Sequence, residues 1–122
     1  MHQSINSRFV IQQHHMPDGV HWDLMLEKGD KLWTWRLDRY PPDTHQALAA
    51  ERIFDHPLKF LTYEGAVRNG TGKVVIADRG TLQYRDITAD TITFRLDGDR
   101  IKGTFILQLD AAPQWTLSRP DQ

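Results

Sequence analysis

Cysteine is absent from this 122-residue sequence, which excludes disulfide bonds and zinc sites built from thiolates. No run of apolar residues approaches the ~20 that a membrane-spanning helix needs, and the N-terminus lacks the pattern of a secretory signal peptide. We therefore expect a cytoplasmic protein without a membrane partner. An excess of charge is also missing, since 15 basic and 16 acidic residues leave a net charge of −1. A polyanion would have to meet a local patch rather than a general basic field.

What is present is typical of one globular domain, which we expect to span residues 1–122. Short segments of alternating apolar and polar residues are separated by turn signals. This spacing favours a mainly all-β fold, and specifically a small closed or partly open antiparallel β-barrel of about seven or eight short strands with one or two short helices. The expected strands are 8–13, 21–27, 32–37, 73–77, 81–84, 91–96, 101–109 and 115–118.

The middle of the chain is less regular. Residues 44–51 have helix-forming composition, with Asp43 in position to cap the helix, whereas 52–54 fit a helix or a strand equally well. Pro57 ends whatever precedes it, and 58–63 are expected to form a short helical turn.

Three of the six histidines gather in one stretch that has strand alternation. His21 and Asp23 are two residues apart, so their side chains share a face. A turn over 16–19 would bring His14 or His15 toward that pair. Two imidazoles and a carboxylate at one point form a set of ligands for a divalent metal. Because the spacing matches no regular metal motif, a polar strand face with ordinary surface histidines remains the alternative.

The opposite face of this strand is apolar. Trp22, Leu24 and Leu26 alternate with the polar residues, and we expect them in the core. Trp33 and Trp35 share one face of the following strand and are expected to join them.

Several segments carry a family resemblance. In order along the chain they are FVIQQHH…HWDLMLE, LWTWRL, DHPLKF followed by YEG, VVIADRGT, RIKGTFIL and WTLSR. Together, from residue 8 to 119, they resemble the 3′-phosphoesterase domain of the bacterial DNA ligase D proteins, which also occurs as small standalone proteins.

The resemblance implies a compact β-barrel whose concave face holds a divalent cation, typically manganese. The implied activity is removal of a 3′-terminal ribonucleotide or a 3′-phosphate from a DNA primer end in non-homologous end joining. The implied partners are DNA or DNA/RNA 3′ ends, with ligase or polymerase repair proteins, and we expect a monomer. Histidine and carboxylate ligands also suit zinc and other transition metals.

Carried over position by position, the resemblance implies that His15, His21 and Asp23 bind the metal. His15 is chosen because it lies six residues before His21, the family's interval. His56 matches a phosphate-contacting histidine that is expected to act in acid–base catalysis. Glu27 matches an acidic residue at the end of the same strand, and we count it as a catalytic-site residue that would orient a metal ligand.

Three positions depart from the family. Met25 stands where the family has an arginine, Phe60 where it has a tyrosine, and Leu48 where it has a basic residue. Each replacement removes a group that would hold a phosphate. We expect Met25 to line the site beside the metal, on the face of Asp23. Metal binding is therefore better supported than turnover.

Four cations are candidates to compensate for the missing phosphate contacts: Arg39, Arg52, Arg68 and Lys102. Arg52 is favoured because it lies four residues before His56 and would share its face. The alternative for each is a solvated surface charge. Three hypotheses remain open: a 3′-end phosphoesterase, an enzyme for another phosphate ester, and a module that binds nucleic-acid ends through its metal without hydrolysis.

Overall fold

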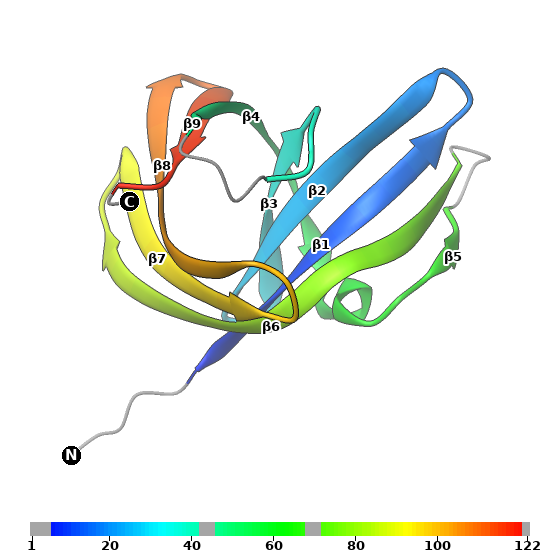
Figure 1. Cartoon of the computed structure of the whole chain (residues 1–122), viewed down its shortest axis with the longest axis horizontal. Helices are drawn as coiled ribbons and strands as arrows, with labels where there is room; N and C mark the ends of the chain where they lie inside the picture. The colour runs from blue at the N-terminus through cyan, green and yellow to red at the C-terminus, as the bar shows by residue number, and fades with distance from the viewer. Residues whose placement is uncertain (1–5, 42–45, 68–71, 121–122) are drawn as a thin grey trace.

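Nine antiparallel strands form one sheet in the computed structural model, which describes residues 6–41, 46–67 and 72–120. The sheet has the order β1-β2-β3-β4-β9-β8-β7-β6-β5, and pairing of β1 with β6 closes eight of the strands into a barrel, as predicted (Figure 1). The elements are β1 (Ser7–Met16), β2 (Gly19–Lys28), β3 (Lys31–Leu37), β4 (Leu48–Pro57), the 3₁₀ helix η1 (Leu58–Leu61), β5 (Gly65–Ala66), β6 (Lys73–Ile87), β7 (Thr91–Gly98), β8 (Lys102–Ala111) and β9 (Gln114–Ser118).

Tight turns set the register of the first three strands. Two residues, Pro17 and Asp18, join β1 to β2, so that Met16 pairs with Gly19. Gly29 opens the next two-residue turn at a φ of 64°, a left-handed conformation that glycine adopts without strain. The first turn lies where the sequence predicts it, and the second lies between the strands expected at 21–27 and 32–37. Each turn fixes which side chains stand opposite one another farther along the strands.

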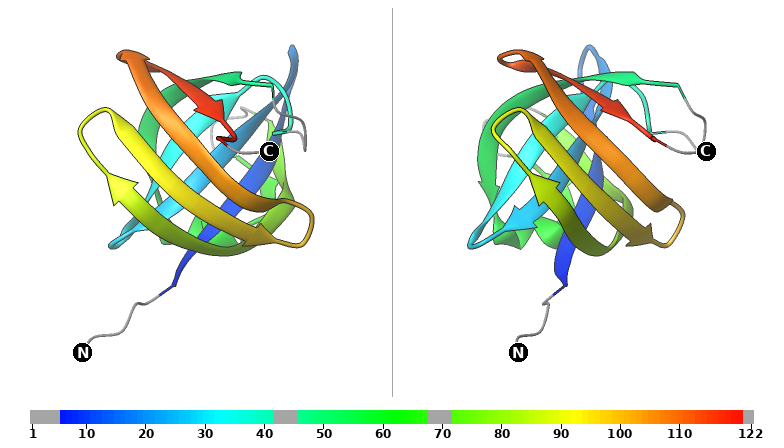
Figure 2. Two further views of the ribbon diagram at one scale, coloured as in Figure 1. Left: turned by 60° about the vertical axis from the view of Figure 1, so that its left-hand side comes forward. Right: turned by 90° about the vertical axis from the view of Figure 1, so that its left-hand side faces the viewer.

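The main core lies where inward-facing residues of all eight barrel strands meet. Figure 2 shows the strands wrapping around this space. Leu24 and Leu26 are 1% and 0% exposed there, and Trp22 packs against them partly buried, which confirms the predicted apolar face of β2. The largest fully buried side chains include Trp35, Phe9, Phe94 and Phe105.

A second, smaller apolar cluster covers the other face of β1, β2 and β3. Val10, Met25, Leu32 and Leu61 are buried together, and Leu61 comes from η1. Gln12 ties this region to β1, because its buried amide donates hydrogen bonds to the carbonyl oxygens of residues 60 and 63. The first strands are thus buried on both faces, which holds their polar side chains in place.

The expected helix at 44–51 is wrong over residues 48–51, which begin β4; Asp43 and residues 44–45 lie outside the described residues. Leu48 and Ala50 are buried in the core while β4 pairs with β3 on one side and β9 on the other. Tertiary pairing therefore overrides helix propensity.

The short helical turn after Pro57 is confirmed as η1. Within the described part of the chain, no helix has the length and apolarity needed to cross a membrane.

The strands expected at 73–77 and 81–84 are not separated by a turn, because residues 78–80 continue them as one strand, β6. Asp78 is buried, and its carboxylate accepts hydrogen bonds from the backbone N–H groups of Asp99, Arg100 and Ile101 in the β7–β8 turn. Gly80 permits close strand contact, since a Cβ there would lie 2.0 Å from the Asp97 carbonyl oxygen. The Asp-x-Gly motif thus anchors a distant turn rather than forming one.

We expect Leu24→Ala to lower the free energy of unfolding by ~2–5 kcal/mol, because it leaves a cavity in the main core. Chemical denaturation would measure the change. Ile87→Ala is a suitable control, since Ile87 is 40% exposed and its truncation should cost about 0.5 kcal/mol or less. An unchanged denaturation midpoint for Leu24→Ala would contradict the inward placement of this face.

Candidate metal and phosphate site

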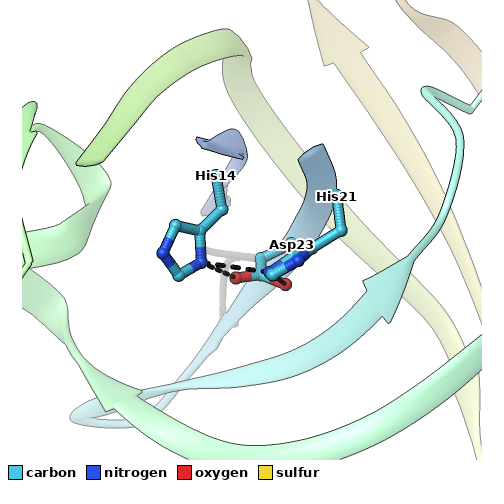
Figure 3. A group of neighbouring side chains, drawn as sticks. All are labelled: His14, His21 and Asp23. Atoms are coloured by element: carbon cyan, nitrogen blue, oxygen red, sulfur yellow. Dashed lines mark hydrogen bonds and ion pairs between the residues drawn. The ribbon is translucent and has the colours of Figure 1, made fainter. Parts of the chain in front are cut away.

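The β1–β2 register brings three potential metal ligands together. His14 stands directly opposite His21, and Gln12 stands opposite Asp23. His14 Nδ1 lies 3.0 Å from His21 Nε2 and 3.9 Å from Asp23 Oδ2, while His21 Nε2 lies 3.6 Å from Asp23 Oδ1. Figure 3 shows the three side chains turned toward one another from the two neighbouring strands. Their potential ligand atoms all lie within 4.8 Å of one another.

This donor set fits a divalent metal. It offers two imidazole nitrogens and one carboxylate oxygen, and the side chains are only 10%, 15% and 4% exposed. Burial raises the pKa of Asp23, but the interaction with His21 and the charge of Arg36 outweigh it, so the pKa lies below its usual range. Asp23 is therefore ionised at neutral pH, the state a metal ligand requires.

His15, the ligand chosen from the family interval, does not join this group. It pairs with Val20, so its side chain leaves the strand on the face opposite His14, and its Nε2 lies 2.9 Å from Gln13 Oε1. In this hairpin, a residue of β1 and a residue of β2 share a face only when their numbers differ by an odd number. His15 and His21 differ by six, so they lie on opposite faces. The turn predicted over 16–19 already implied the correct register and could have identified His14.

Arg36 is a site residue that the sequence reasoning missed. It lies opposite Asp23 on β3, and its Nε donates to Asp23 Oδ1 at 3.2 Å. Its side chain is 36% exposed, so it reaches solvent while touching the cluster. A tight turn between the strands expected at 21–27 and 32–37 sets Asp23 opposite Arg36 by simple counting, which is the signal that would have found it.

His56 comes to the same region from β4. Its Nδ1 lies 2.9 Å from Thr34 Oγ1 and 3.1 Å from the Phe54 carbonyl oxygen. A carbonyl only accepts, so Nδ1 carries the proton and the neutral ring has its lone pair on Nε2. Burial lowers the pKa of His56 from its ordinary value, and the opposing charge of Asp23 only partly offsets this. The imidazole is therefore mainly neutral at pH 7.

A pocket of about 240 Å³ connects these groups. Its polar lining includes His14, Asp23, Arg36, His56 and Gln12, and its apolar lining is formed by Met16, Phe54, Phe60, Val67 and Val74. A cation site, a guanidinium and a neutral imidazole thus face one small cavity. Such a constellation suits an anion with an attached apolar or aromatic group.

Arg52, the favoured compensating cation, lies on the wrong face for this pocket. A β-bulge places two residues of β4 opposite one of β3, so that Arg52 and His56 point to opposite faces although they are four residues apart. Its guanidinium instead lies 4.6 Å from the Trp35 ring centroid and 3.3 Å from an Asp55 carboxylate oxygen. Its role is packing and a local ion pair.

Met25 shares the face of Asp23, as expected, but does not line the pocket. It is 1% exposed within the small apolar cluster under η1. An arginine here would have to bury its charge among Val10, Leu32 and Leu61. Phe60 does line the pocket, whereas Leu48 is buried in the main core.

Glu27 lies away from the candidate metal ligands. Its carboxylate pairs with the Arg8 guanidinium at 2.7 Å, and that hydrogen bond lowers the pKa of Glu27. It lies four residues beyond Asp23 on β2, roughly 13 Å away at ~3.3 Å per residue, so it does not orient a ligand.

Of the remaining predicted cations, Lys102 and Arg39 do not meet the cluster. Lys102 pairs with Asp97 across β7 and β8, with its Nζ 2.9 Å from the carboxylate. Arg39 is exposed just after β3 ends. Arg68 lies outside the described residues.

Comparison with known proteins gives a consistent result. A family model described as the DNA ligase D 3′-phosphoesterase domain matches residues 12–109. The chain is 34% identical over 122 aligned residues to the multifunctional non-homologous end joining protein LigD of Mycobacterium bovis, covering 91% of this chain and 16% of that protein. It is 28% identical over 109 residues to the LigD of Pseudomonas aeruginosa, covering 82% of this chain and 13% of the relative. The chain thus spans less than a fifth of the length of these relatives.

We expect His14→Ala to weaken binding of Mn²⁺ or Zn²⁺ at least on the order of 10–100-fold, since even changes outside the ligand set have effects of that size. Isothermal titration calorimetry would measure the affinity. His15→Ala is the matched control, because it removes a neighbouring imidazole on the other strand face. Loss of affinity in His15→Ala with retention in His14→Ala would overturn the assignment.

Proposed function

We propose, because this chain belongs to the DNA ligase D 3′-phosphoesterase domain family, that it is a metal-dependent phosphoesterase that acts on the 3′ ends of DNA. The proposed reaction is removal of a 3′-phosphate or a 3′-terminal ribonucleotide in DNA end repair. The supporting observation is the convergence of His14, His21 and Asp23, because His14 and Asp23 also line a pocket that contains Arg36 and His56. We assign manganese as the metal on the family resemblance, since the donor set suits several divalent ions.

The proposed metal would supply charge neutralisation and polarisation of the scissile P–O bond. The side chains of the chain itself supply the rest. Asp23 is already ionised, and the two imidazoles are held against each other edge to face, with ring centroids 4.6 Å apart. Little rearrangement is needed for these three groups to act together.

Arg36 is the proposed phosphate-binding residue. A permanent positive charge 3.2 Å from a ligand carboxylate opposes binding of a cation, so its presence here needs a compensating role. A guanidinium has five N–H donors, and the contact with Asp23 uses one of them. Others are available to a phosphate oxygen entering the pocket. Arg36, which lies on β3, thereby makes the phosphate contact that the family makes from the position of Met25 on β2.

His56 is the proposed acid–base group. Its Nδ1–H group donates to the Thr34 hydroxyl and the Phe54 carbonyl oxygen. These hydrogen bonds fix the ring, so proton exchange takes place at Nε2. With a lowered pKa, the protonated ring is a strong donor to a leaving oxygen, and the neutral ring accepts a proton at pH 7.

A second candidate function is end binding without hydrolysis. Met25 and Leu48 are buried apolar residues at places where the family has basic groups, and Phe60 lacks the hydroxyl of the family's tyrosine. These losses favour a binding module. His56 favours the enzyme, because simple binding does not require an imidazole with a fixed tautomer.

We expect the purified protein with Mn²⁺ to shorten a 5′-labelled primer that carries one 3′-terminal ribonucleotide, or to release its 3′-phosphate, and EDTA to stop the reaction. His56→Ala should reduce the rate about 10²–10⁴-fold, the usual size of an acid–base contribution. His15→Ala should react as the wild type does. A wild-type protein that binds the primer but leaves it intact with every divalent metal tested would establish the binding module instead.

We expect Arg36→Gln to lower kcat/KM for the primer about 10- to 150-fold, which corresponds to ~1.5–3 kcal/mol for one hydrogen bond to a charged group. Mn²⁺ affinity should stay equal or rise, because a positive charge beside Asp23 is removed. Arg39→Gln, an exposed arginine after β3, is the control. Parallel loss of metal affinity and activity in Arg36→Gln would mean that Arg36 positions Asp23 rather than the phosphate.

A further inference from the structure

Phe54 is the most exposed large apolar side chain in the described part of the chain, at 72%. It lies on β4 and stacks on His56, with ring centroids 4.6 Å apart and planes inclined by 19°. Scattered exposed apolar residues need no explanation, but this ring lines the candidate pocket and covers the proposed acid–base residue. Its position therefore calls for a role at the site.

The aromatic surface extends beyond Phe54. The Phe60 ring meets His56 edge to face at 5.4 Å, and Tyr63 meets Phe60 in the same manner at 5.6 Å. The backbone of this segment is fixed to β1, because the Gln12 amide donates to the carbonyl oxygens of both Phe60 and Tyr63. Phe54, Phe60 and Tyr63 together form an aromatic wall, and its Phe60–Tyr63 part is held against β1 without any ligand.

The pocket beside this wall is small. Its 240 Å³ is below the ~300–1,000 Å³ of usual ligand pockets, so it admits one residue of a strand end rather than a duplex. Its lining combines the charged Arg36 and Asp23 with the apolar Phe54 and Val74. A group that carries both a phosphate and a flat ring matches this mixed lining.

We propose that Phe54 is a base-stacking platform, on which the unpaired nucleobase of the 3′-terminal nucleoside lies while its phosphate meets Arg36. This inference rests on the proposed function and specifies its substrate as a base-bearing, frayed 3′ end. Stacking on an aromatic ring tolerates every base, since each has a π-face, so the site would not select sequence. It would discriminate against an end that lacks a base.

The test uses a primer with a 3′-terminal 2-aminopurine ribonucleotide, whose fluorescence falls when the base stacks. It is rapidly mixed with the Mn²⁺-loaded protein and followed through the first turnover. We expect quenching with the wild type and with Phe54→Trp. Phe54→Ala should lose the quenching and bind the primer about 5- to 150-fold more weakly, the range for one base–aromatic stack. Ile87→Ala, another exposed apolar residue, should behave as the wild type does.

A primer with an abasic 3′-terminal residue separates stacking from indirect effects. Wild type and Phe54→Ala should bind this primer equally. Equal weakening of Phe54→Ala on the base-bearing and abasic primers would mean that Phe54 only supports His56, and quenching retained in Phe54→Ala would place the base elsewhere; either result overturns the platform. Quenching that depends on Phe54 without any cleavage would instead reject the proposed enzyme and leave the platform standing.

Discussion

The register of the β1–β2 hairpin is the constraint on which the rest of the site depends. Because two residues close the turn, His14 meets His21 and Gln12 meets Asp23 on one face, while Ile11 meets Leu24 on the other. A slip of β2 by one residue would turn His21, Asp23 and Leu24 to the opposite face while the side chains of β1 stayed in place. It would empty the core and separate the ligands at once, so the packing that stabilises the barrel also preserves the metal site.

Burial on both sides of the first strands gives this register its rigidity. The main core covers one face, and the smaller cluster under η1 covers the other around Val10 and Met25. Position 25 is thereby committed to packing, and a cation for the pocket has to come from a neighbouring strand. Arg36 on β3 meets that need because it stands opposite Asp23. On that face of the sheet, this pair is the neighbour of the buried Met25–Thr34 pair.

The charges of the site are balanced rather than simply accumulated. Asp23 is buried yet ionised, since His21 and Arg36 together outweigh the effect of burial on its pKa. His56 is kept mainly neutral by burial, although Asp23 favours its charged form. The site holds an ionised carboxylate, a permanently charged guanidinium and a neutral imidazole. It can therefore accept both a metal ion and a phosphate without leaving a buried charge unpaired.

The sequence by itself determined the strand periodicity, the tight turns, the apolar face of β2 and the presence of histidine and aspartate on the other face, because these are local properties of alternation and turn chemistry. It also contained the family relationship. Counting residues across the turn selects His14 over His15, but the six-residue interval of the family led to His15. Only the tertiary structure decided that residues 48–51 form a strand, that a bulge turns Arg52 away from His56, and that Met25 is buried. Pairing across strands distant in sequence, a one-residue irregularity and the contacts of η1 have no local signature, so the face and burial of these residues depend on the closed barrel.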